Sequence, residues 1–130
     1  MAQEPADSSR ELALYAAQLV LGKKGHDLKL MEVGKVSIVA DFFLICTGNT
    51  AVQVHSICDH LLETLKQKNY YALRVEGYKE AWWVVIDYGF LVIHVFQPEA
   101  RSFYDLERLW YEAPQVFIDS EGNTLPAAPQ

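Results

Sequence analysis

The hydrophobic pattern of the chain is densest over residues 82–96, where two blocks of Val, Ile and aromatic residues flank Tyr88-Gly89. A glycine at the second position of a two-residue connection supplies the positive φ that a tight hairpin turn requires. The pattern therefore predicts a β-hairpin with Tyr88-Gly89 at its tip, and this turn pairs Asp87 with Phe90 and Trp83 with His94.

Alternate residues of a strand point to opposite faces of a sheet, so the predicted hairpin has two faces. The first is almost entirely apolar and is expected to pack on a core; it carries Trp82, Val84, Ile86, Leu91, Ile93 and Val95. The second combines a carboxylate, an imidazole and large aromatic rings; it carries Trp83, Val85, Asp87, Phe90, Val92, His94 and Phe96. We therefore expect one buried face and one face available for function.

Local signals place the other elements. Ser8 and Glu11 have capping-box spacing, which predicts a helix that begins at Ser8 and ends at Gly22. Residues 42–46 are continuously apolar, as in a strand covered on both faces. The remaining predicted elements are a strand over 28–33, a helix after Thr50 with Val54, Ile57, Cys58, Leu61, Leu62 and Leu65 on its apolar face, a strand over 73–76, and helices over 98–104 and 105–110. An apolar segment at 116–118 is suited either to pairing with a sheet edge or to docking on the surface.

Length and composition favour one globular domain. The chain has 130 residues, of which 51% are hydrophobic and 22% charged. No apolar run approaches the roughly 20 residues that a membrane-spanning helix needs, so no membrane association is expected. We predict disordered ends at residues 1–7 and 119–130 around a domain at 8–118. Because the N-terminus has no basic region followed by an apolar stretch, we expect a cytoplasmic location.

The charge of the chain bears on its partner. Seventeen acidic residues against eleven basic ones give a net charge of −6, and the Lys and Arg residues are scattered. A protein that holds nucleic acid through its phosphates needs a basic patch. We therefore expect no primary nucleic-acid contact, and a basic protein is the more natural partner.

Candidate chemistry is sparse. Asp87 and His94 share the second face, but the predicted register places them at opposite ends of the hairpin, which favours a turn-stabilising carboxylate and a packed histidine over an acid/base pair. Cys46 and Cys58 are interpreted as small buried hydrophobes. The turn at 47–50 lacks the lysine of a phosphate-binding loop, so helix capping is favoured over anion binding. The histidines show no metal-ligand spacing, and neither Glu76 nor Asp87 on the predicted strands has an acidic neighbour two residues away.

Aromatic residues are the remaining functional signal. Trp83 and Phe96 lie on the second face of the hairpin, and Arg101, Tyr104 and Trp110 follow in the predicted helical segment. These residue types dominate the energetically important centres of protein interfaces. Each also has a structural alternative as partly covered core, and the group is more informative than any single member.

Several motifs occur in one order along the chain: Ala40–Phe43, Thr47–Asn49, Leu73–Gly77, Trp83–Gly89, Val92–Phe96, Pro98–Arg101 and Tyr104–Trp110. Together they resemble the ribosomal silencing factors, the Iojap-like family. The resemblance implies an α/β fold, a nucleotidyltransferase-like mixed sheet with helices that lacks the catalytic carboxylates. It also implies a protein that is not an enzyme, needs no cofactor and binds the large ribosomal subunit through the fourteenth large-subunit ribosomal protein, thereby blocking the small subunit and repressing translation.

The resemblance also assigns partner-binding residues: Trp83, Asp87, Tyr88, Gly89, His94, Pro98, Glu99, Arg101, Tyr104 and Trp110. One position departs from the family, because Phe90 stands where an acidic residue is usual. Two other functions are retained as alternatives, a nucleotide-handling enzyme of the same fold and a module whose partner is a second copy of itself, a homodimer.

Overall fold

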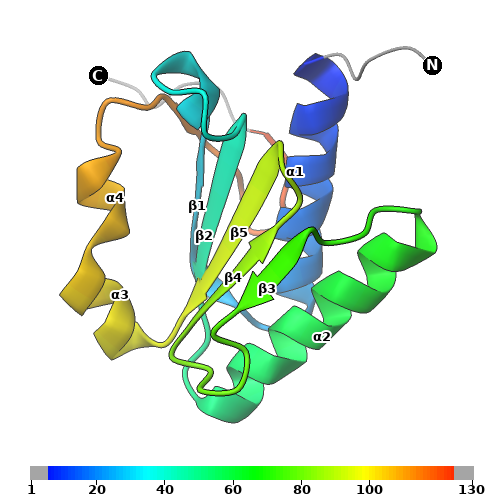
Figure 1. Ribbon diagram of the computed structural model, residues 1–130, viewed down its shortest axis with the longest axis vertical. Coiled ribbons are helices and arrows are strands. Elements are labelled where there is room, and N and C mark those ends of the chain that lie inside the picture. Colours follow the sequence, from blue (N-terminus) through cyan, green and yellow to red (C-terminus); the bar gives the residue numbers. More distant parts are fainter. Residues whose placement is uncertain (1–5, 125–130) are drawn as a thin grey trace.

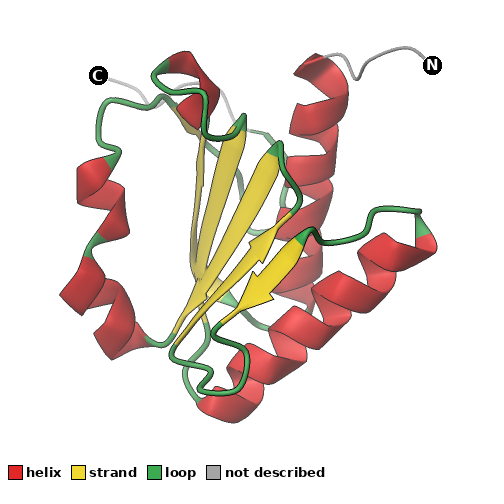
Figure 2. Ribbon diagram, viewed as in Figure 1, coloured by secondary structure: helices red, strands yellow, loops and turns green. Residues whose placement is uncertain are grey.

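The structure is a computed structural model that describes residues 6–124 of the chain. A six-stranded mixed sheet lies between two pairs of helices (Figures 1 and 2), with the strand order β3-β4-β5-β2-β1-β6. In chain order the elements are α1 (Ala6–Gly22), β1 (His26–Met31), the 3-10 turn η1 (Val33–Lys35), β2 (Phe42–Thr47), α2 (Ala51–Gln67), β3 (Arg74–Glu76), β4 (Trp83–Asp87), β5 (Leu91–Phe96), α3 (Pro98–Tyr104), α4 (Leu106–Leu109) and β6 (Gln115–Val116). The predicted α/β class is confirmed. None of the helices within residues 6–124 is long and apolar enough to cross a membrane.

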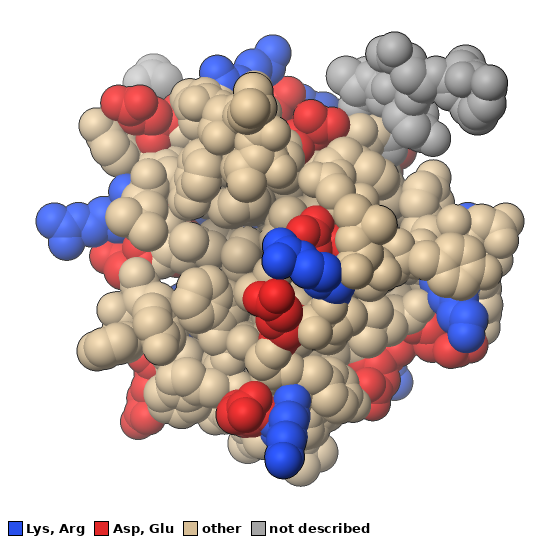
Figure 3. All heavy atoms as spheres, in the orientation of Figure 1, with Lys and Arg blue, Asp and Glu red and all other residues tan. Residues whose placement is uncertain are grey.

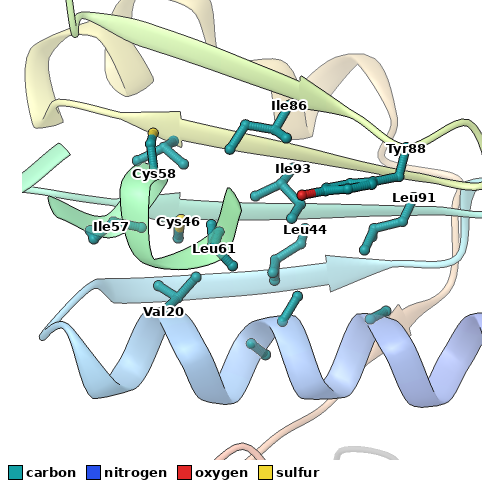
Figure 4. Close-up of a cluster of buried hydrophobic side chains, with 14 of the residues drawn as sticks. Val20, Leu44, Cys46, Ile57, Cys58, Leu61, Ile86, Tyr88, Leu91 and Ile93 are labelled. Atoms are coloured by element: carbon teal, nitrogen blue, oxygen red, sulfur yellow. The ribbon is translucent and has the colours of Figure 1, made fainter. Parts of the chain in front are cut away.

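Strands β2 and β5 form the centre of the sheet and are its only parallel pair in the described range. Every residue of both strands is buried, which confirms the prediction for residues 42–46. Alternate side chains of β2 enter two separate cores: Leu44 and Cys46 pack under α1 and α2 (Figure 4), whereas Phe43 and Ile45 pack on the side of α3 and α4.

Helix α2 follows its predicted pattern closely. Thr50 caps it, because its Oγ1 accepts the backbone N–H of Gln53 at 3.1 Å, and the carboxamide of Gln53 accepts the N–H of Asn49 at 2.6 Å. These two bonds satisfy donors that have no partner inside the helix. The favoured interpretation of the 47–50 turn as a cap is therefore confirmed, and the predicted apolar face lies against the sheet, with Leu62 only half-buried.

The hairpin forms, but its predicted register is wrong. Trp83 pairs with Phe96, and Asp87 pairs with Val92. The two-residue tip is Gly89-Phe90, closed by a 2.8 Å bond from the Tyr88 N–H to the carbonyl of Leu91, with Gly89 at φ +89° in the first position rather than the second. The turn therefore lies one residue later in the chain than predicted. Gly89 occupies its first position instead of its second, and the strand pairing moves by two residues.

A shift of two residues preserves which face each side chain occupies. Val84, Ile86, Leu91, Ile93 and Val95 therefore enter the core under α1 and α2, as predicted. Two assignments fail because the residues lie outside regular strand: Trp82 precedes β4 and is 39% exposed, and Phe90 sits in the turn and packs beside Tyr70, with ring centroids 6.4 Å apart.

The expectation that the second face stays open is also wrong for most of its length. After β5 the chain turns back through α3 and α4 across this face (Figure 1), so that His94 is only 5% exposed and Phe96 is fully buried. Within the strands of this face, the part nearest the β3 edge remains half-exposed, at Trp83, Val85 and Asp87.

The ends of the chain differ from prediction in detail. Helix α1 begins at Ala6, two residues before the predicted Ser8. The segment at 116–118 contributes β6, which pairs with β1 at a sheet edge, one of its two predicted placements. Beyond it, residues 119–124 form a turn in which the Asp119 carboxylate accepts the N–H groups of Glu121 and Asn123, each at 2.9 Å. The predicted disorder at 1–5 and 125–130 lies outside the described residues.

Candidate protein-docking site

An aromatic cluster is built around Trp83 on β4. Its indole stacks on Phe96 of β5 at a centroid distance of 5.0 Å and lies 4.8 Å from the ring of Tyr104 on α3. Its Nε1–H donates to Nδ1 of His94 at 3.1 Å. The predicted proximity of Trp83 and His94 is therefore confirmed, although they are diagonal rather than directly paired neighbours.

The cluster continues under α4. The ring of Phe43 lies edge-on to His94, with centroids 4.8 Å apart, and edge-on to Trp110 at 5.2 Å. Edge-to-face contacts of this kind add to the burial of apolar area. Tyr104, Trp83, His94, Phe43 and Trp110 thus form one continuous array that joins α3, the sheet and the segment after α4. Phe43 was not among the predicted partner-binding residues, although its alternate position in β2 places it on this face.

His94 is held as a neutral residue. Burial lowers the pKa of its imidazole from the usual 6.5 to about 4, and nearby Asp87 opposes this only partly. Because Trp83 donates to Nδ1, the imidazole proton resides on Nε2, which has no hydrogen-bond partner among the described residues. A buried imidazole of this kind is suited to packing rather than to proton transfer.

Asp87 is closer to His94 than the predicted register placed it. His94 pairs with Val85, which puts Asp87 two positions away on the same face rather than at the opposite end. Its carboxylate is already engaged: Oδ2 accepts from Arg74 at 3.2 Å, and Oδ1 accepts the N–H of Gly89 at 2.8 Å. The interpretation of Asp87 as a turn-stabilising residue is confirmed.

The exposed part of this region is the outer side of α3 and α4. Large side chains project from it next to one another along the chain, and an open groove runs between them. We call this the α3–α4 surface and define it by Phe103, Tyr104, Arg108, Leu109 and Tyr111. Of this set, Tyr104 alone was among the predicted partner-binding residues. Charged side chains on the face shown in Figure 3 are scattered rather than gathered into one patch.

The structure brings together four of the residues assigned by resemblance, namely Trp83, His94, Tyr104 and Trp110. Pro98 and Glu99 are exposed at the start of α3, and Asp87 and Gly89 lie at the hairpin turn. Tyr88 lies elsewhere, because its ring is buried in the core under α1 and α2 (Figure 4). Arg101 is mostly buried and makes bonds within the protein.

Other candidate chemistry is structural in this fold. Cys46 and Cys58 are free and buried, as interpreted from the sequence, and burial raises the pKa of the Cys58 thiol to about 12. Asn49 accepts a 2.8 Å hydrogen bond at its Oδ1 from Nε2 of His26. Within residues 6–124, no three His, Cys, Asp or Glu side chains are grouped in a way that could hold a metal ion.

Comparison with known proteins gives one consistent result. The family described as "ribosomal silencing factor during starvation" matches residues 6–130. A ribosomal silencing factor from Halalkalibacterium halodurans is 39% identical over 86% of this chain and 96% of its own length. A solved protein structure from Bacillus halodurans superposes with a TM-score of 0.75 at 38% identity, over 84% of this chain and 99% of the other. A mouse protein named mitochondrial assembly of ribosomal large subunit protein 1 is 28% identical over 71% of this chain and 42% of its own length.

Proposed function

Because the chain belongs to the ribosomal silencing factor family, we propose that it binds the large ribosomal subunit and prevents the small subunit from joining. The partner is the fourteenth large-subunit ribosomal protein, and the effect is repression of translation in the cytoplasm. The protein acts by occupying a surface and performs no covalent chemistry. The name of the mouse relative, which refers to assembly of the large subunit, supports this choice of subunit.

The α3–α4 surface is the proposed docking site, and its exposure is the observation that carries the proposal. Phe103, Leu109 and Tyr111 are all more than 70% exposed, which is unusual for side chains of this size so close together. Tyr104 and Trp83 connect this surface to the half-exposed part of β4. A large aromatic and aliphatic centre is typical of protein interfaces.

Charge supports a basic protein as the partner. The net charge of −6 attracts a basic ribosomal protein over a distance of about one Debye length, roughly 8 Å at physiological salt. On the face shown in Figure 3, the basic residues are scattered and give no track for a phosphate backbone. In this proposal the apolar α3–α4 surface makes the contact with the partner, and the net negative charge of the domain attracts the basic partner before contact.

We also infer that the fold is related to that of nucleotidyltransferases, without their paired catalytic carboxylates. The mixed sheet between helices supports this relationship. In the described part of the chain, Asp87 is committed to Arg74 and to the hairpin turn.

Subunit association, followed by light scattering after the purified protein is added to separated subunits, tests the proposal. The unmodified protein should reduce association. Leu109→Ala, which removes a side chain that is 74% exposed on α4, should weaken the effect about tenfold, equivalent to about 1.4 kcal/mol. Val52→Ala is the matched control, because Val52 is 78% exposed on α2, which covers the other face of the sheet (Figure 1).

Four outcomes would contradict the proposal or its docking site. If the unmodified protein left subunit association unchanged, the proposed silencing function would be wrong. Nucleotide turnover, or a melting temperature that depends on nucleotide, would favour the enzyme alternative. A concentration-dependent size without binding to the large subunit would favour the homodimeric module. If Leu109→Ala and Val52→Ala weakened the inhibition of subunit association equally, the α3–α4 surface would not be the docking site.

A further inference from the structure

The α3–α4 surface rests on two helices that are too short to be stable alone. Helix α3 has seven residues and α4 has four, whereas isolated helices shorter than about 12 residues are marginal in water. Asp105 joins them in a left-handed conformation, with φ 50° and ψ 51°. That conformation is unfavourable for a residue with a side chain, so contacts elsewhere must hold the junction.

Arg101 supplies those contacts from the middle of α3. Its Nη1 donates to Oγ1 of Thr47 at 2.8 Å and also to the carbonyl oxygen of Asp27. Its Nε donates to the Glu107 carboxylate at 2.8 Å, and Nη2 lies 2.7 Å from the same oxygen. Three of the five N–H donors of the guanidinium are thereby hydrogen-bonded inside the protein, and Nη2 forms an ion pair with Glu107. One side chain thus connects α3 with α4 and with two strands of the sheet.

The strand ends present these acceptors at fixed positions. Thr47 is the last residue of β2 and pairs with Phe96, immediately before the chain enters α3. Asp27 lies in an irregular part of β1 where the pairing with β2 shifts, and it has a positive φ of 53°. Its carbonyl lies at this irregularity and accepts from Arg101.

Burial distinguishes this cluster from an ordinary surface ion pair. The Arg101 side chain is 15% exposed and that of Glu107 is 19% exposed. The guanidinium therefore has little area left for a partner to contact. Glu107 lies on α4, two residues before Leu109 of the α3–α4 surface, so its anchoring fixes the position of that surface relative to the sheet.

We propose that Arg101 is a positioning residue for docking: it locks α4 against the sheet, so that Leu109 and Tyr111 are presented together with Phe103 and Tyr104. This inference rests on the proposed function and refines it, because the family resemblance places Arg101 among the residues that contact the partner. A locked surface is already in its binding conformation. Loosening it lowers the fraction of molecules that can bind and leaves the contacts themselves intact.

A positioning residue and a residue that contacts the partner directly affect different rate constants of binding. Loss of a positioning residue should lower the association rate constant, because fewer molecules are competent at each encounter, while loss of a direct contact should raise the dissociation rate constant. Arg101→Lys keeps the charge and loses the planar fork, and Glu107→Gln keeps the shape and loses the carboxylate. Arg10→Lys is the matched control, because Arg10 makes a single ion pair with Glu32 at 3.2 Å outside the α3–α4 region.

Two measurements on the whole protein test the inference: hydrogen exchange of residues 106–112 in the free protein, and binding kinetics with purified large subunits. We expect Arg101→Lys and Glu107→Gln to increase exchange in this segment about tenfold without changing it in β2, β5 and α2. Association should slow in proportion to the loss of the locked fraction, with an unchanged dissociation rate, and Arg10→Lys should change neither. If Arg101→Lys opens the entire fold, Glu107→Gln decides, since it leaves the bonds to Thr47 and Asp27 in place.

Other results would overturn the inference. Faster dissociation with normal exchange in 106–112 would make Arg101 a direct contact. Faster exchange with normal binding would show that α4 need not be locked for docking. Failure of the unmodified protein to bind large subunits would overturn the proposed function and the positioning role together, and is distinguishable because it appears before any substitution is made.

Discussion

Acid should destabilise this fold through His94, and replacement of His94 by Phe should remove that part of the acid sensitivity. The imidazole is buried between Trp83, Phe43 and Phe96, and burial lowers its pKa to about 4. In the unfolded chain the same group returns to its ordinary pKa of about 6.5. The two states therefore bind different numbers of protons between these values.

The direction follows from proton binding. Above pH 6.5 the imidazole is neutral in both states, and the full stability of the fold is present. As the pH falls from 6.5 towards 4, the unfolded chain binds a proton that the folded protein excludes, so the free energy of unfolding decreases. With the pKa values above, the loss at pH 5 is about 2 kcal/mol and approaches about 3 kcal/mol at pH 4.

Urea unfolding of the unmodified protein and of His94→Phe, at pH 7.5 and pH 5.0, measures this loss. Carboxylates titrate in both proteins and cancel in the comparison, so the difference between the two pH-dependent changes isolates His94. Trp83→Phe is an informative third protein: it keeps an aromatic ring but leaves buried Nδ1 without its donor, which should cost about 1–3 kcal/mol at pH 7.5. An equal loss between pH 7.5 and 5.0 in the unmodified protein and in His94→Phe would refute the reasoning, because it would mean that folded His94 takes up a proton freely.

Three backbone and core substitutions test the fold itself by urea unfolding. Gly77→Ala should cost about 2 kcal/mol or more, because Gly77 has φ +81° and a methyl group there would lie 2.2 Å from the carbonyl oxygen of Trp83. Gly22→Ala should instead stabilise by about 0.5 kcal/mol, since no atom lies within 4 Å of the added methyl group in α1; a loss at Gly22 as large as at Gly77 would contradict the steric argument. Tyr88→Phe should change stability by less than about 0.5 kcal/mol, because its buried hydroxyl has no partner among the described residues, and a loss above about 1 kcal/mol would reveal a bond to that oxygen.

The parts of the fold that follow from local pattern were predictable from the sequence. The apolar face of α2, the doubly covered strand at 42–46 and the face assignment of the hairpin depend on periodicity alone. The hairpin shows how tolerant this inference is: the predicted register was displaced by two residues, yet Val84 and Ile86 still enter the expected core. An error of one residue would have reversed every assignment.

The cover over the second face was not predictable in the same way. Seven-residue α3 and four-residue α4 are too short to show a helical period, and their placement depends on bonds between distant parts of the chain. Arg101 contacts Thr47 and Asp27, which precede it by 54 and 74 residues. A local pattern contains no information about such distant contacts. The sequence therefore indicated Arg101 as a residue type common in interfaces but did not predict that it connects α3 to the sheet.

The structure divides the residues assigned by resemblance into two groups with different expected behaviour. His94 and Arg101 are largely buried and support the surface from below, whereas Tyr104 is exposed on it. Substitution of a supporting residue changes stability or local order first and affinity as a consequence, while substitution on the α3–α4 surface, as with Leu109→Ala, changes affinity alone. Trp83 belongs to both groups, because its ring packs against Tyr104 and its indole N–H donates to Nδ1 of His94. A loss of binding with Trp83→Ala is therefore uninformative by itself and becomes evidence for a contact only after the accompanying loss of stability has been measured.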